Sequence, residues 1–99
     1  VTFRANPATA APGSRFKVNL SVAGFAAVTT AQFTLEWNPA VLSYVGTGDY
    51  GLTGMAGANF GANNTAAGRL TFSWDDPNAT GVTVADGTVI FSVEFDAVG

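Results

Sequence analysis

Apolar and polar residues alternate at every second position along much of the chain, and a period of two predicts β-strands. The alternation covers residues 16–22, 31–37, 69–75 and 88–96. Each of these segments would have one apolar and one polar face, which suits antiparallel sheets packed on one side and solvated on the other. Two such sheets facing each other form a sandwich. The pattern therefore predicts an all-β fold, an antiparallel β-sandwich or jelly roll.

Turn residues separate the predicted strands. Ala-Pro-Gly-Ser at 11–14 precedes the second strand, 16–22; Asn38-Pro39 ends the third, 31–37; and Asp86-Gly87 opens the last. Proline removes a backbone donor and restricts the residue before it, so a strand stops there. No segment of about 10–12 residues has a helical period. We expect at most one helical turn, at Pro39–Leu42.

The stretch 46–68 is different, because it holds seven of the twelve glycines. A long loop without secondary structure is uncommon inside a compact domain. We therefore expect a short strand around Ala58–Ala62, followed by a turn at Asn63–Gly68.

Length and missing residue types narrow the class of protein. The chain has 99 residues, without cysteine or histidine. This length predicts one domain, 1–99. The lack of cysteine and histidine excludes disulfides, imidazole catalysis and nearly all zinc sites.

The chain starts at Val1 without a signal peptide, as a mature or excised domain would. Its richness in Thr, Ala, Gly and Asn favours a secreted or cell-surface protein of a bacterium or archaeon.

The charges exclude two further classes of partner. The net charge is −3, and the four basic residues are scattered along the chain. Without a basic patch we expect neither nucleic-acid binding nor polybasic attachment to a membrane. No apolar run approaches the ~18 residues that span a bilayer.

Only 11% of the residues are charged. Such a surface is either rich in hydroxyl and amide groups or partly covered by neighbouring chains.

Four pieces of sequence, in order, resemble the cohesin family, the β-sandwich modules of cellulosome scaffoldins and related surface proteins. They are APGSRFKVNL at 11–20, AQFTLEWNPAVL at 31–42, GRLTFSWDD at 68–76 and DGTVIFSVEF at 86–95. The resemblance implies a cohesin-like sandwich that is not an enzyme and that docks a dockerin-like protein partner.

The second piece would form a strand and a corner. By this resemblance Trp37 closes the inner face of the strand, and Asn38-Pro39 turns the chain so that Val41 and Leu42 return to the core. Asn stands where the family more often has Asp. Both cap the following turn through a side-chain oxygen, so the geometry should be kept.

The chain departs from the family at two places. Cohesins are longer jelly rolls, and this chain ends at Gly99 after what would be its sixth strand. Either another segment supplies the remaining strands, or the domain closes with fewer. At the recognition face, Thr30 and Gln32 stand where the family commonly has Asn and Asp. They can form hydrogen bonds but offer no carboxylate to a charged partner.

Asp75, Asp76 and Asn78 form the acidic cluster of the sequence. Calcium prefers several hard oxygen ligands, so a calcium loop is one interpretation. The segment lacks the EF-hand pattern, however, and an acidic turn after a strand is the interpretation we favour, with no cofactor. Acid–base catalysis by Asp75 and Asp76 is not expected, because adjacent strand residues point to opposite faces.

Aromatic and lysine side chains give weaker indications. Trp37 and Trp74 lie on apolar faces, so both are expected in the core rather than on a sugar-binding platform. Tyr50 lies in the glycine-rich segment and is expected to be exposed. Lys17, the single lysine, lies on a polar face, where a solvated side chain is expected rather than an internal crosslink.

Outward positions of three strands form the candidate binding face. It combines polar residues of 30–36 and 69–75 with outward residues of 88–96. The candidates are Thr30, Gln32, Thr34, Glu36, Thr71, Ser73, Asp75, Ile90 and Ser92. An ordinary solvated sheet face is the alternative interpretation.

Three functions follow from this sequence. The first is an extracellular docking module that uses the polar face. The second is a structural subunit of a surface layer or fibre, completed by a strand from a neighbour through an open sheet edge. The third is a small carbohydrate-binding module.

Overall fold

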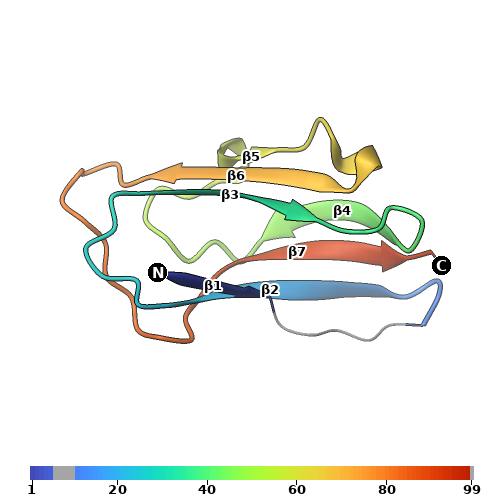
Figure 1. The fold of residues 1–99 in the computed structure, drawn as a ribbon, viewed down its shortest axis with the longest axis horizontal. Coiled ribbons are helices and arrows are strands. Elements are labelled where there is room, and N and C mark those ends of the chain that lie inside the picture. Colours follow the sequence, from blue (N-terminus) through green and yellow to red (C-terminus); the bar gives the residue numbers. More distant parts are fainter. Residues whose placement is uncertain (6–10, 99) are drawn as a thin grey trace.

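In the computed structural model, which describes residues 1–5 and 11–98, the chain forms two antiparallel sheets (Figure 1). One sheet has the strand order β1-β2-β7-β4, and the other has the order β3-β6-β5. The strands are β1 (Thr2–Ala5), β2 (Arg15–Ala23), β3 (Thr30–Glu36), β4 (Leu42–Gly48), β5 (Phe60–Gly61), β6 (Arg69–Asp75) and β7 (Val89–Ala97). Two short 3-10 helices, η1 (Gly57–Asn59) and η2 (Thr65–Ala67), flank β5.

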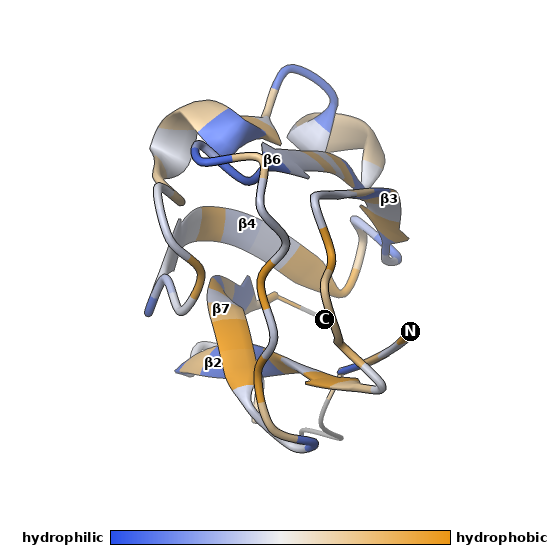
Figure 2. Cartoon of the chain, turned by 90° about the vertical axis from the view of Figure 1, so that its left-hand side faces the viewer, coloured by the Kyte–Doolittle hydropathy of each residue, from blue (hydrophilic) through white to orange (hydrophobic). Residues whose placement is uncertain are grey.

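The two sheets pack face to face, as the alternating pattern predicted. Figure 2 shows them from one end as two layers, with β3 and β6 in one and β2 and β7 in the other. On β6 the residues Leu70, Phe72 and Trp74 are fully buried, whereas the residues between them are exposed. The rings of Phe72 and Phe91, which come from opposite sheets, lie 5.0 Å apart. The predicted antiparallel β-sandwich is confirmed.

The corner after β3 forms as expected, except at one residue. The side-chain oxygen of Asn38 accepts a hydrogen bond from the backbone N–H of Ala40 at 3.0 Å. The backbone carbonyl of Asn38 accepts from Val41 and Leu42. Leu42 is partly buried against the core, but Val41 is 40% exposed. The prediction that Val41 returns to the core is wrong, because β4 starts at Leu42 and alternation along it turns Val41 outward.

Strand β7 breaks the predicted alternation. Leu20 pairs with Phe91 and Ser21 with Val89, so Ile90 is the extra residue of a β-bulge. Both Ile90 and Phe91 are fully buried. The segment after β4 lies across this point, since the N–H of Gly51 donates to the carbonyl of Ile90 at 2.7 Å. The predicted outward, exposed position of Ile90 is therefore wrong.

The glycine-rich stretch contains a short strand, as expected. Strand β5 lies within the predicted 58–62, and η2 lies within the predicted turn 63–68. Gly68 ends this turn with a φ of 81°, and a β-carbon there would overlap the carbonyl oxygen of Trp37. Strand β4, which runs into the start of the stretch, was not predicted. Neither short helix of the described chain has the length and apolar character needed to cross a bilayer.

Candidate docking face

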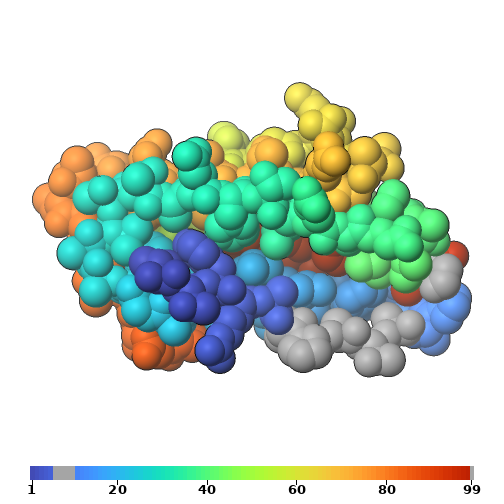
Figure 3. Space-filling view, viewed as in Figure 1, coloured from blue at the N-terminus to red at the C-terminus, as the bar shows by residue number. Residues whose placement is uncertain are grey.

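The outer face of strands β3 and β6 brings together seven of the nine candidate residues. All seven are exposed: Thr30, Gln32, Thr34 and Glu36 on β3, and Thr71, Ser73 and Asp75 on β6. We call these seven residues the polar face. Alternation places them outward because Ala31, Phe33 and Leu35 of β3, and the buried residues of β6, point into the sandwich. Figure 3 shows the β3 side of the molecule, where this strand runs along the surface above β1.

The register between β3 and β6 arranges the polar face in rows. Thr30 faces Asp75. Gln32 faces Ser73, and Thr34 faces Thr71. Side chains directly opposite each other on one face lie within contact range. The centre of the face is therefore uncharged and presents hydroxyl and amide groups.

Charges lie only at the two ends of the polar face. Asp75 lies at one end. At the other, Glu36 faces Arg69, and the Arg69 Nε lies 3.8 Å from Glu36 Oε1. Both side chains of this ion pair are largely exposed, so it contributes little to stability. Both groups therefore remain available to a partner.

Strand β5 and η1 extend the polar face on the β6 side. Asn59 donates through Nδ2 to the backbone carbonyl of Ser73 at 3.0 Å and accepts through Oδ1 from the N–H of Ala56 at 2.7 Å. The hydroxyl of Thr71 donates to the carbonyl of Gly61 at 3.4 Å. A shallow depression between β3 and β6 is lined by Gln32, Thr34, Thr71 and Ser73, with Phe33 and Phe72 beneath them. Sequence reasoning missed the contribution of Asn59.

Two candidate residues do not belong to the polar face. Ile90 and Ser92 lie on β7, which is in the other sheet. Both are buried, with exposed fractions of 0% and 1%. The prediction that they share a surface with β3 and β6 is wrong, because alternation shows which residues share a strand face but not which strands share a sheet.

Ser92 belongs to a different polar cluster, on the outer side of β2, β4 and β7. Its hydroxyl donates to Oδ2 of Asp49, and the Lys17 Nζ lies 3.3 Å from the same oxygen. The hydrogen bond from Ser92, followed by the interaction with Lys17, holds the pKa of Asp49 below its usual value. Lys17 is half exposed, as expected for a solvated lysine. An ionised, exposed carboxylate beside it does not favour an amide crosslink.

The acidic cluster at the end of β6 is divided between surface and interior. Asp75 is exposed on the polar face, whereas Asp76 is 6% exposed. The Asp76 carboxylate accepts backbone N–H bonds from Asn78 at 3.1 Å and from Thr80 and Gly81 at 3.0 Å. These bonds lower the pKa of Asp76, that from Asn78 most strongly. The carboxylate thus organises its own loop.

The structure gives the weak calcium candidates Asp75, Asp76 and Asn78 no added support. Among residues 1–5 and 11–98, no three carboxylate, histidine or cysteine side chains come together in a group that could hold a metal ion. The two adjacent carboxylates also differ in environment: Asp75, the last residue of β6, is exposed, whereas Asp76, the residue after the strand, is buried.

The tryptophans do not form a surface platform. Trp74 is fully buried, and Trp37 is partly buried with its ring 5.0 Å from that of Phe95. Tyr50 is exposed as predicted, and its ring stacks on Phe60 at 6.0 Å. A sugar-binding surface built on the two tryptophans is therefore not present.

The molecule is thus a β-sandwich with one exposed and mostly uncharged sheet face that another protein could contact. Comparison with family models matches residues 1–98 to the Cohesin domain, so the chain belongs to the cohesin family. This confirms the family assignment made from the sequence. No curated protein and no solved structure gives a significant match.

Membership of this family carries general consequences. Cohesin domains are non-catalytic modules of protein–protein interaction that bind dockerin-type partners. They generally need no cofactor, and they are typically extracellular or on the cell surface. The chain is accordingly a protein-interaction module.

Proposed function

We propose that this chain is a secreted or cell-surface docking module of a bacterium or archaeon, and that its polar face binds a dockerin-like protein. One observation supports this above the others: seven side chains chosen from the sequence lie exposed on one face of β3 and β6, in a chain that belongs to the cohesin family. The whole described chain serves as the scaffold of this face.

The composition of the polar face indicates how a partner would be held. Its central rows carry hydroxyl and amide groups, which donate and accept hydrogen bonds without the cost of desolvating a charge. Asp75 and the Glu36–Arg69 pair lie at its ends, where they would steer a partner and fix its orientation. We therefore expect a partner that presents its own uncharged hydrogen-bonding groups to the centre of the face.

Surface plasmon resonance against a panel of recombinant dockerin modules tests this function. We expect at least one dockerin to bind the wild-type chain and Gln32→Arg to weaken that binding more than tenfold, because a long charged side chain would occupy the central row. Ser43→Arg is the matched control. Ser43 is exposed on β4 of the other sheet, so this variant should bind as the wild type does. Equal affinities of the two variants would contradict the proposed face, and the absence of any binding dockerin would contradict the partner class.

A further inference from the structure

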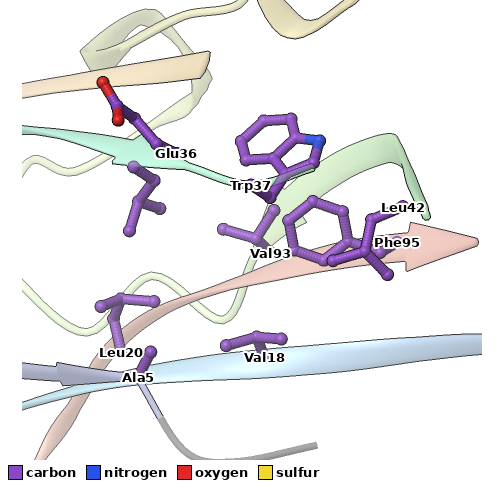
Figure 4. Close-up of a pocket in the computed structure, with 9 residues that line it drawn as sticks. Ala5, Val18, Leu20, Glu36, Trp37, Leu42, Val93 and Phe95 are labelled. Atoms are coloured by element: carbon purple, nitrogen blue, oxygen red, sulfur yellow. The ribbon is translucent and has the colours of Figure 1, made fainter. Parts of the chain in front are cut away.

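The sheet β1-β2-β7-β4 has a polar outer side that the docking proposal does not use. Figure 4 shows Val18 of β2 and Val93 of β7 in the space between the two sheets. Successive side chains of a strand point to opposite faces. Lys17 on β2, and Ser92 and Glu94 on β7, therefore lie on the outer side of the sheet. This side stays open whichever strands pair with the edges of the sheet.

A depression of about 160 Å³ lies on this outer side, where β2, β7 and β4 run side by side. Gly46 of β4 is opposite Glu94, and Gly48 is opposite Ser92. From the other side of β7, Lys17 is opposite Glu94. The depression is therefore a gap beside a row of polar groups, left where β4 has no side chains. Its lining residues are Lys17, Gly46, Thr47, Gly48, Ser92 and Glu94.

Nothing in the described part of the chain requires glycine at positions 46 and 48. Neither Gly46 nor Gly48 has a positive φ, and a β-carbon added to either would have no atom within 4 Å. Glycine inside a strand costs stability, because it loses more conformational freedom on folding than other residues do. It often marks a place where a ligand or another backbone approaches closely. Together with the depression, the two bare positions point to a ligand against β4.

Groups of both charges surround the same small space. The Nζ of Lys17 lies 3.3 Å from Oδ2 of Asp49, which follows β4 and also accepts a hydrogen bond from Ser92. Glu94 is partly buried, and its carboxylate forms no salt bridge within residues 1–5 and 11–98. Lys17 would repel a cation from the depression, whereas Glu94 and Asp49 would repel an anion. A neutral ligand that both donates and accepts hydrogen bonds fits these groups best.

We propose that this depression binds one ring of a neutral sugar. Each hydroxyl group of a sugar donates one hydrogen bond and accepts others. Neighbouring hydroxyls of one ring would donate to the Glu94 carboxylate and accept from the Lys17 ammonium group, while the ring lies against the bare backbone of Gly46 and Gly48. Sites for drug-sized ligands begin at roughly 300 Å³. The depression is smaller, so it takes a single ring of a glycan whose remaining rings stay on the surface.

The sugar site is separate from the docking face. The polar face lies on β3 and β6, and the depression lies on the outer side of the other sheet. One module can therefore hold a glycan and a dockerin-like protein at the same time. Gln32→Arg, which is expected to weaken docking, should leave sugar binding unchanged. Failure of one proposal can thus be distinguished from failure of the other.

Titration followed by heteronuclear NMR of the backbone amides tests the site. The probes are the methyl β-glycosides of glucose, xylose, galactose and mannose, added at millimolar concentrations. We expect at least one of them to shift the amide signals of Gly46, Gly48 and Glu94. Its dissociation constant should be about 1–10 mM, because a single ring in a shallow site buries little surface. The proposal is overturned if none of the four shifts these signals, or if ethylammonium chloride or sodium acetate shifts them instead.

Gly48→Val tests the glycine floor of the depression. The valine side chain would fill the space of the sugar ring and should raise the dissociation constant of the glycoside more than tenfold. Because valine suits a strand and open space surrounds position 48, the variant should remain folded. Ser43→Val is the matched control, since Ser43 is exposed on the same strand but does not line the depression. Equal dissociation constants for the two variants would place the sugar elsewhere and overturn the proposal.

Glu94→Gln tests the polar wall. It keeps the shape of the side chain but replaces a charged acceptor by a neutral one, and charge-assisted hydrogen bonds are roughly twice as strong as neutral ones. We expect the dissociation constant to rise at least about threefold. Glu36→Gln, on β3 of the other sheet, is the matched control and should bind the glycoside as the wild type does. A Glu94→Gln variant with wild-type affinity would overturn the role of this carboxylate and the ligand class inferred from it.

Discussion

The indole Nε1 of Trp74 donates a hydrogen bond to the backbone carbonyl oxygen of Thr53 at 2.9 Å. Trp74 is fully buried, and this bond joins β6 to the segment that leads from β4 to η1. The Nε1 of Trp37 is also buried, but it is without a hydrogen-bond partner in the described part of the chain. The two tryptophans thus differ in a testable way: one has its polar atom satisfied, and the other does not.

Replacing each tryptophan by phenylalanine should separate these roles. Trp74→Phe leaves a cavity and an unpaired Thr53 carbonyl, so we expect the free energy of unfolding to fall by about 2–4 kcal/mol. Trp37→Phe also loses packing but removes an unpaired buried donor, so we expect a loss of only about 1–2 kcal/mol. Urea denaturation measures both. Equal losses would show that the hydrogen bond of Trp74 contributes little.

Ile90→Arg should unfold the protein or come close to it. Ile90 is fully buried beneath the segment that includes Gly51, and burying an unpaired guanidinium there should cost at least about 3 kcal/mol. Val89→Arg is the control, because Val89 is next to it on the same strand and is exposed; we expect a change within about 1 kcal/mol. Thermal unfolding followed by circular dichroism compares the two. A folded Ile90→Arg variant with near wild-type stability would mean that Ile90 is not part of the core.

Three of the strands that the sequence predicted, β2, β3 and β6, pack one face alone on the core; the fourth, β7, was predicted although the bulge at Ile90 interrupts its alternation. In β2, β3 and β6 the alternation is uninterrupted, because each side chain meets either the opposite sheet or solvent. β4 was missed because alternation stops at its bulge at Val45, and Gly46 and Gly48 follow. Bulges arise from pairing with distant strands, so no local period announces them.

The candidate face was predictable to the extent that it depends on alternation. Thr34 and Thr71 could be recognised as outward from their own strands, and their strands prove to be neighbours. Ser92 is outward on its strand by the same rule, yet β7 lies in the sheet that does not contain β3 and β6, and Asp49, which follows β4 of that same sheet, covers Ser92. The order of strands in a sheet depends on contacts between residues that are distant in the sequence. The local period of two does not reveal these contacts.

The stabilisation that the ionised Asp76 carboxylate provides should be lost in acid. Its pKa is lowered in the folded state, chiefly by the N–H of Asn78, so the folded protein holds the ionised form more strongly than the unfolded chain does. This stabilisation is fully present above the ordinary carboxylate pKa and is lost as the pH falls through the lower folded pKa. We expect Asp76→Asn to lower the melting temperature at neutral pH. The difference from wild type should shrink as the solution is acidified below about pH 4.

Asp75→Asn is the matched control for this pH dependence. Asp75 is the preceding residue and is exposed on the polar face. The Asp75→Asn variant should follow the wild-type melting temperature across the whole pH range. If Asp76→Asn differed from wild type by the same amount at pH 7 and at pH 2, the bonds to the Asp76 carboxylate would not depend on its charge.

Gly68→Ala should destabilise the turn between η2 and β6. Gly68 has a φ of 81°, and a β-carbon there would overlap the carbonyl oxygen of Trp37. The strained backbone and this clash should together lower the free energy of unfolding by more than about 1 kcal/mol.

Gly48→Ala is the control, because open space surrounds that position in β4 and its φ is not in the left-handed region. Chemical denaturation should show Gly48→Ala unchanged or stabilised by up to about 1 kcal/mol. A Gly68→Ala variant as stable as Gly48→Ala would contradict the close approach of this turn to Trp37.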